Sequence, residues 1–144
     1  MALLANHIAV VTGAGSGIGR AIAAGYAREG ARVVLLDVNS DTVAEAAQEI
    51  REAGGKAESF ALDVTRREDC FALVKQVEGK VGQVSILVNN AGITRRNAFT
   101  AETETVAKDW NDIISLNLNG VFNMTQAFLA PLRASKGRIV NIGS

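Results

Sequence analysis

The sequence predicts an α/β fold with a doubly wound parallel sheet of about five strands and helices on both faces. Two observations lead to this fold class. Short apolar runs rich in β-branched residues alternate with stretches whose apolar residues recur at helical spacing. Glycines follow most of the helical stretches and end them. Because a strand–helix–strand connection within one sheet is right-handed, this alternation implies parallel strands with helices on both sides.

The first predicted strand, at residues 8–12, is a β-branched apolar run that breaks into glycines. The helix that follows keeps an apolar face until Gly30 ends it. A second apolar strand at residues 32–36 ends at Asp37. The middle of the chain repeats the pattern with helices opened by capping residues. It predicts a helix from Ser40 or Asp41 to about Ala53, a strand at residues 57–62, a helix capped by Thr65 and running to about Glu78, and a strand at residues 85–89.

The last third of the chain is less regular. Residues 93–107 are polar and predict a loop with a short helical turn. A long helix is expected from about Lys108 to Leu132, with Asn117 on an apolar stripe that includes Trp110. A fifth strand is expected at residues 138–142, with apolar side chains on an uncovered edge.

The composition fits one globular domain without internal repeats. The 144 residues are 48% apolar and carry 15 basic and 15 acidic side chains. With neither net charge nor a Lys/Arg cluster, no nucleic-acid surface is expected. No apolar run reaches the roughly 18 residues of a membrane span and no signal-peptide pattern opens the chain, so we expect a cytoplasmic protein without a membrane partner. One His and one Cys predict no metal site.

The turn from Gly13 to Gly19 is the most informative stretch. Glycines allow positive φ and let a diphosphate approach the backbone, and the following helix offers free N–H groups at its positive dipole end. A plain glycine-rich turn is the alternative. The spacing Gly13-x-x-x-Gly17-x-Gly19 is neither a P-loop nor the G-x-G-x-x-G fingerprint. Ligands of parallel sheets bind outside the carboxyl ends of the strands, where this turn, Asp37, Asp63, Asn89-Asn90-Ala91-Gly92 and Ser144 are all expected.

Two motifs at this edge resemble those of the short-chain dehydrogenase/reductase family. One is Thr12 followed by the glycine spacing, and the other is Asn89-Asn90-Ala91-Gly92. The resemblance covers essentially the whole chain. It implies a Rossmann-like fold and hydride transfer between a nicotinamide and a secondary alcohol or ketone. Because residues 90–95 resemble the 3-oxoacyl-carrier-protein reductase branch, 3-oxoacyl compounds are one candidate substrate class.

The cofactor implied by the resemblance is NAD, with NADP less favoured. Asp37 lies where the family reads the adenosine ribose, and its carboxylate would repel a 2′-phosphate. Ser16 stands where many NADP-using relatives carry a basic residue. A solvated or capping acid is the alternative for Asp37, and helix capping is the alternative for Asp63. The implied cofactor-binding residues are Gly13, Ser16, Gly17, Ile18, Gly19, Asp37, Asp63, Val64, Asn90, Ala91 and Gly92.

The resemblance also implies catalytic roles for Asn117 and Ser144. Asn117 would hold a water in a proton relay, although a satisfied core amide is its alternative, and Ser144 would bind the substrate carbonyl. The family's catalytic Tyr, four residues before a Lys, is expected beyond Ser144. The only tyrosine, Tyr26, is followed at that spacing by Gly30. We therefore expect residues 1–144 to be one dinucleotide-binding domain that stops after its fifth strand, without the C-terminal part of the fold and inactive alone.

Three functions stay open at this level. The first is the oxidoreductase, acting on a small carbonyl or alcohol and assembled as a homo-oligomer. The second is a dinucleotide-binding or self-assembling module without turnover. The third is an S-adenosylmethionine methyltransferase, because Gly13-x-Gly15-x-Gly17 and an acid after the second strand also fit that class. That class expects an acid just before the glycines, where Val11 and Thr12 stand.

Overall fold

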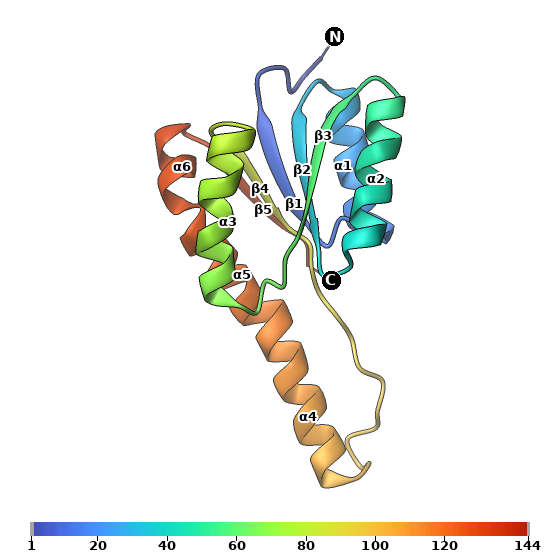
Figure 1. Ribbon diagram of the computed structural model, residues 1–144. Coiled ribbons are helices and arrows are strands. Elements are labelled where there is room, and N and C mark those ends of the chain that lie inside the picture. The colour runs from blue at the N-terminus through green and yellow to red at the C-terminus, as the bar shows by residue number, and fades with distance from the viewer. Residues whose placement is uncertain (1, 144) are drawn as a thin grey trace.

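The computed structural model describes residues 2–143 and contains a five-stranded parallel sheet in the order β3-β2-β1-β4-β5. Helices cover both faces of the sheet, which confirms the predicted fold class (Figure 1). In chain order the elements are β1 (Ile8–Thr12), α1 (Gly17–Arg28), β2 (Arg32–Asp37), α2 (Ser40–Glu52), β3 (Lys56–Ala61), α3 (Arg67–Lys80), β4 (Ile86–Asn89), α4 (Thr103–Ile113), the π-helical segment η1 (Ile114–Asn119), α5 (Gly120–Ala127), α6 (Leu129–Ala134) and β5 (Arg138–Asn141).

Two apolar layers hold the sheet between its helices. Successive residues of a strand point to opposite faces, so Val10 and Val11 of β1 enter different layers. The layer of Val11 is filled by α1 and α2, and the layer of Val10 is filled by α3, α5 and α6 (Figure 1). The inner strands are buried on both faces, which is why they read as continuous apolar runs in the sequence.

Two predicted helix caps are wrong, and side-chain hydrogen bonds give the reason. The cap of α2 is Asn39, whose Oδ1 accepts from the N–H groups of Asp41 and Thr42 at 3.0 and 3.2 Å. Thr65 does not cap α3, which begins at Arg67. The backbone N–H of Thr65 donates instead to Oδ1 of Asp63 at 2.9 Å and forms a separate turn. Local turns of this kind compete with helix caps for the same side chains.

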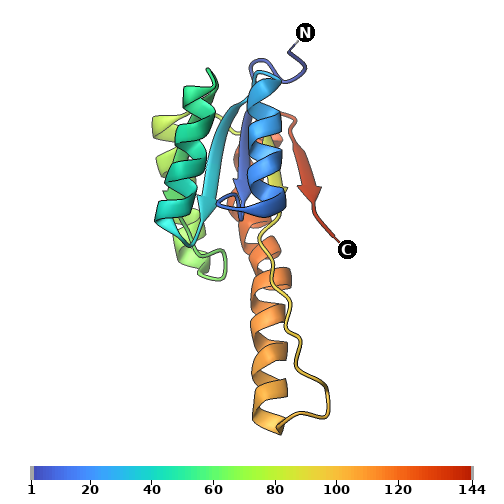
Figure 2. The same ribbon diagram turned by 90° about the vertical axis from the view of Figure 1, so that its right-hand side faces the viewer.

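The long helix predicted from Lys108 to Leu132 is longer and less regular than expected. It begins at Thr103, passes through the π-helical segment η1, and is broken at Phe128 between α5 and α6. Figure 2 shows α4 and the loop before it extending far beyond the sheet. Trp110 is 67% exposed and Asn117 is exposed, so their expected burial on an apolar stripe is wrong. The stripe becomes buried where α5 and the residue after it, Phe128, pack against the sheet, at residues such as Met124.

The fifth strand lies at the sheet edge, as expected. β5 pairs only with β4 among the described residues, and all four of its residues are exposed. Ile139 and Val140 are apolar side chains on this uncovered strand. A further apolar residue, Ile142, follows them and is also exposed.

Candidate functional site

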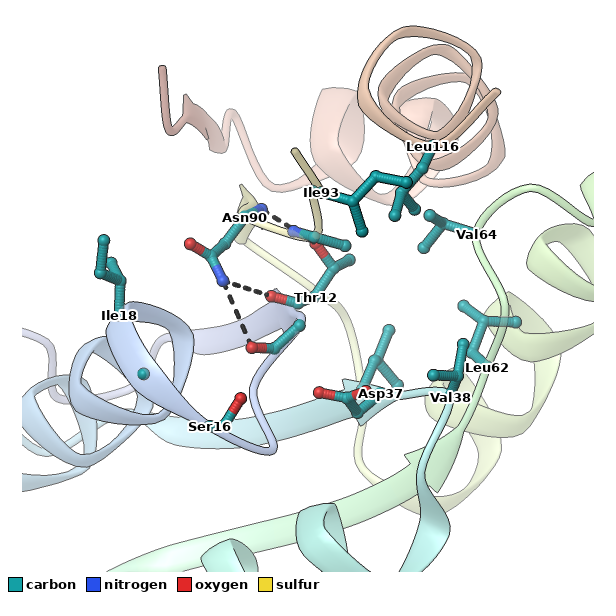
Figure 3. A pocket seen from close by; sticks show the side chains of 15 residues that line it. Thr12, Ser16, Ile18, Asp37, Val38, Leu62, Val64, Asn90, Ile93 and Leu116 are labelled. Carbon is teal, nitrogen blue, oxygen red and sulfur yellow. Dashed lines mark hydrogen bonds between the residues drawn. The ribbon is translucent and has the colours of Figure 1, made fainter. Parts of the chain in front are cut away.

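A cavity of about 570 Å³ opens at the carboxyl ends of β1, β2 and β4 (Figure 3). It is bounded by the glycine turn on one side and by the segments that follow β2, β3 and β4 on the others. Its lining residues are Thr12, Gly13, Ser16, Gly17, Ile18, Leu36, Asp37, Val38, Leu62, Val64, Asn90, Ala91, Gly92, Ile93 and Leu116. The fold therefore brings together all but Gly19 and Asp63 of the predicted cofactor residues.

The glycines of the turn have different tasks. Gly13 and Gly17 have φ angles of +61° and +55°, which L side chains rarely adopt. A Cβ on Gly17 would meet no atom within 4 Å, so this residue leaves open space toward the cavity. A Cβ on Gly19 would lie 2.3 Å from the carbonyl oxygen of Gly13 and 2.5 Å from Nδ2 of Asn90. Gly19 lets α1 pack directly against the turn without lining the cavity.

The N-terminus of α1 faces the cavity. Ser16 precedes the helix with an extended backbone and lines the cavity, and its side chain makes no capping hydrogen bond. The first turn of α1 carries no acidic residue. Helix N-terminal amides and the helix dipole favour an anion at such a place. The arrangement can accept a diphosphate between the turn and the helix.

Asp37 stands at the end of β2 on the cavity wall. Its Oδ2 accepts from the backbone N–H of Gly15 at 2.9 Å, and Oδ1 accepts from the N–H of Asn39 at 3.4 Å. A Cβ on Gly15 would lie 2.8 Å from Oδ2, so the close approach requires glycine. The carboxylate is oriented by backbone donors and presents negative charge to the cavity.

Of the two predicted cofactor residues after β3, only one lines the cavity. Val64 lines the cavity, whereas Asp63 does not. Oδ1 of Asp63 accepts from both the N–H and the hydroxyl of Thr65, at 2.9 and 2.7 Å. These bonds organise the loop between β3 and α3. Within residues 2–143, Oδ2 of Asp63 takes no hydrogen bond and stays available as an acceptor.

Thr12 joins the turn to the segment after β4. Its buried hydroxyl accepts from the N–H groups of Asn90 and Ala91, both at 2.9 Å, and donates to the carbonyl of Val88 at 3.4 Å. Nδ2 of Asn90 donates in turn to the carbonyls of Thr12 and Gly13 at 3.2 and 3.3 Å (Figure 3). This network fixes the two motifs against each other and forms the floor of the cavity.

Asn117 lies on η1 beside the cavity-lining residues Ile93 and Leu116 but does not itself line the cavity. Its Oδ1 accepts from the N–H of Ile93 and its Nδ2 donates to the carbonyl of Ile93, both at 2.9 Å. Both polar atoms of the Asn117 amide therefore bond to the backbone of Ile93, although the residue is exposed. π-helical segments occur frequently at functional sites. Ser144 lies outside the described residues.

Sequence reasoning missed several residues of the site. Val38, Leu62, Ile93 and Leu116 line the cavity, and each adjoins a segment that the sequence had marked. Asn123 was also missed, although a polar residue beside Met124 on a buried helix face is itself a signal. Cys70 is buried, and burial raises the pKa of its thiol to about 11, which is consistent with a packing residue and not a nucleophile.

A family model described as "short chain dehydrogenase" matches residues 7–144. The chain belongs to the short-chain dehydrogenase family. This match argues against the methyltransferase alternative, because the matched family consists of dehydrogenases. It also agrees with the glycine turn and the Asn-Asn-Ala-Gly segment meeting at one cavity.

Individual members of the short-chain dehydrogenase family are similar to almost all of this chain. It is 37% identical over 142 residues to a 3-oxoacyl-[acyl-carrier-protein] reductase of Thermotoga maritima, covering 98% of this chain and 56% of that protein. A gluconate 5-dehydrogenase from Burkholderia cenocepacia, solved with NADP and tartrate, has a TM-score of 0.89 and 38% identity, covering 98% of this chain and 55% of that one. A putative NAD(P)-dependent gluconate 5-dehydrogenase from Beutenbergia cavernae has a TM-score of 0.86 and 39% identity, again covering 98% of this chain and 55% of that one. The chain thus spans about half the length of these relatives.

Proposed function

We propose that this chain supplies the cofactor site of an NAD(H)-dependent oxidoreductase that transfers hydride between the nicotinamide and a secondary alcohol or ketone. The observation that carries the proposal is the cavity at the carboxyl ends of the strands. It is lined by Gly17, beside which there is open space, and by Asp37, whose carboxylate is oriented by two backbone N–H groups. In it, the glycine turn and the start of α1 would hold the diphosphate. Asp37 would accept hydrogen bonds from the adenosine ribose hydroxyls.

The remaining site residues take roles on either side of the diphosphate. Val64 would contact the adenine ring, and the free Oδ2 of Asp63 would accept from its amino group. Asn90, Ala91 and Gly92 would line the path toward the nicotinamide. Asn117 would hold a water that passes protons, and Ser144 would bind the substrate carbonyl, as the family resemblance implies. The nicotinamide, when bound, would accept or supply the hydride, and the chain's own residues would orient it.

NAD is proposed over NADP because Asp37 carries a negative charge where a 2′-phosphate would sit. Support comes from its two backbone donors, which hold the carboxylate at the wall. Both solved relatives described above are recorded with NADP, so cofactor choice must be tested on this chain itself.

Calorimetric titration with NADH and NADPH tests both levels of the proposal. We expect NADH to bind at least about tenfold more tightly, and Asp37→Asn to narrow that ratio by removing the repelling charge. Asp41→Asn removes an exposed charge of the same kind outside the cavity and should leave the ratio unchanged. Equal binding of the two cofactors by the wild-type chain contradicts the NAD preference. Failure to bind either contradicts the oxidoreductase proposal.

We further propose that the 144 residues alone bind the dinucleotide without reducing a ketone. Among them, the family's Tyr-x-x-x-Lys pattern is not found, and Tyr26 lies partly buried on α1. A positioned proton donor contributes about 10²–10⁴-fold to rate. Measured turnover of a panel of ketones, 3-oxoacyl compounds included, at a rate typical of dehydrogenases would overturn this part.

The expected partners are a small carbonyl or alcohol and further copies of the chain. Support for self-association comes from the exposed apolar side chains of β5 and α4. No helix within residues 2–143 is both long and apolar enough to cross a membrane. A cytoplasmic location stays a prediction.

A further inference from the structure

Asn123 is a buried polar residue that the catalytic and cofactor roles above do not use. It lies on α5 with 6% of its surface exposed. Its Nδ2 donates to the backbone carbonyl of Val64 at 2.9 Å. A buried amide on an apolar helix face is costly unless it is bonded, so this partner is needed for the residue to be there at all. The partner belongs to the cavity wall.

The peptide between Val64 and Thr65 is held from both sides. Its carbonyl accepts from Asn123, and its N–H donates to Oδ1 of Asp63 at 2.9 Å. Because a peptide unit is planar, two opposed hydrogen bonds fix its orientation. That orientation sets where the Val64 side chain stands on the wall and where the Asp63 carboxylate points.

A second contact from α5 supports the same residue. A Cβ on Gly120 would lie 2.6 Å from Cγ2 of Val64, so the absence of a side chain at Gly120 lets Val64 seat against the helix. Asn123 and Gly120 lie one turn apart on the helix and face the same loop. Helix α5 therefore positions the loop after β3 by one polar and one apolar contact.

We propose that Asn123 is a positioning residue for the adenosine half of the cofactor, acting through the Val64–Thr65 peptide. This inference rests on the proposed dinucleotide site. Without the Asn123 donor, the Val64 carbonyl keeps only the weak thiol donor of Cys70 at 3.6 Å, so the peptide is held less firmly and Val64 and Asp63 can shift together. The diphosphate and nicotinamide contacts come from the glycine turn and the segment after β4, which Asn123 does not touch. The effect should be confined to ligands that carry adenosine.

The test compares three ligands on the 144-residue chain: NADH, AMP and reduced nicotinamide mononucleotide. Asn123→Leu keeps the branching at Cγ and removes the donor, and Asn123→Asp replaces the donor by an acceptor without a large change in size. We expect about five- to tenfold weaker binding of NADH and AMP in calorimetric or competition titrations, and unchanged binding of the mononucleotide. Gly120→Ala pushes on Val64 from the same helix and should give the same pattern. It decides the question if neither Asn123 variant folds.

Ser135→Ala is the matched control. The Ser135 hydroxyl donates to the carbonyl of Val84 at 3.0 Å, a bond of similar kind at the opposite end of the sheet. It should lower the melting temperature without changing the ratio of AMP to mononucleotide affinity. Equal weakening of AMP and mononucleotide in the Asn123 or Gly120 variants, or unchanged AMP affinity, overturns the inference. If the wild-type chain binds no NADH or AMP, the proposed function itself fails.

Discussion

At the scale of single residues, the glycines of the first turn differ in what they require. Gly13 and Gly17 need a backbone conformation that a side chain disfavours, whereas Gly19 needs space. The sequence motif treats them alike. Only their surroundings tell a residue that shapes the turn from one that leaves room for a ligand.

Gly19→Ala should destabilise the protein, because its Cβ would overlap the Gly13 carbonyl. We expect a loss of about 1–3 kcal/mol in the free energy of unfolding, measured by urea denaturation. Gly25→Ala is the control on the same helix, because its Cβ would meet only the end of the Arg28 side chain at 3.7 Å. It should be neutral or slightly stabilising, since alanine favours helix. Equal stability of the two variants would contradict the packing role of Gly19.

Gly17→Ala should affect ligand binding more than folding. The φ of +55° costs an alanine about 1–2 kcal/mol, but no atom of the protein obstructs the methyl group. That methyl enters the open space proposed for the diphosphate. We expect NADH affinity to fall more than tenfold in calorimetric titration while the protein remains folded. Unchanged affinity would place the diphosphate elsewhere.

Thr12→Val tests the network below the cavity. The substitution keeps the shape and leaves the N–H groups of Asn90 and Ala91 without their acceptor. Each unpaired, partly buried donor costs about 1–3 kcal/mol, so we expect a loss of about 2–4 kcal/mol in urea denaturation. Thr12→Ser retains the hydroxyl and should lose only about 1 kcal/mol for the missing methyl. A stable Thr12→Val protein would show that water replaces the hydroxyl.

At the scale of elements, the extension formed by α4 and the loop before it is held mainly by charged side chains. Arg95 of the loop pairs with Asp109 and Asp112 of α4, and Asn97 donates to Asp109 at 2.8 Å. No residue of α4 is buried. The stability of the extension should therefore depend on pH and salt more than that of the apolar layers around the sheet.

The stability of this extension should depend on acid pH through Asp112. A hydrogen bond from Lys108, together with the charges of Lys108 and Arg95, holds the pKa of Asp112 below its ordinary value of 3.8. A folded-state pKa below the unfolded one adds stability above that ordinary value and loses it as pH falls through the folded pKa. Asp112→Asn should accelerate proteolysis of residues 94–101 at neutral pH.

The pH dependence provides the check on Asp112. The difference in unfolding free energy between wild type and Asp112→Asn should shrink as pH falls below 3.8. Glu104→Gln, on the same helix, forms no ion pair among the described residues and serves as control. A difference that persists unchanged in acid would mean that the carboxylate charge is not what holds the extension.

At the scale of the whole molecule, large apolar side chains are exposed both singly and along the extension. Phe99, Trp110, Leu118 and Phe122 are each at least 59% exposed, and they belong to the extension and the helices that continue from it. The sheet adds the uncovered strand β5. Single exposed apolar residues such as Leu3 are ordinary, but several large ones along the same extension favour association.

We therefore expect concentration-dependent self-association in sedimentation velocity. Trp110→Glu places a charge in the middle of the exposed set and should shift the distribution toward monomer. Leu3→Glu makes the same kind of change at an exposed residue outside that set and should not. A monomer at every concentration tested would contradict the expected homo-oligomer.

Much of the cofactor site was predictable because it depends on local backbone chemistry. The turn at Gly13–Gly19, Asp37 and Asn90 lie directly after apolar strands, and parallel strands bring their carboxyl ends together. The failure of Thr65 to cap α3 was not predictable, because its N–H bonds to the Asp63 side chain in a separate turn. The predicted burial of Asn117 on an apolar stripe was wrong for a different reason. Helical periodicity indicates which residues share a face, but not how far the sheet extends beneath that face.

The sequence by itself determined the order of strands and helices, the parallel sheet and the cluster of ligand-binding residues, because each follows from local patterning and a fixed crossover hand. Tertiary structure alone decided which polar groups meet. The bonds of Thr12 to the β4 segment, of Asn117 to Ile93 and of Asn123 to Val64 join residues 24 to 79 positions apart. No local pattern encodes such pairings, since they depend on how two elements are seated against each other.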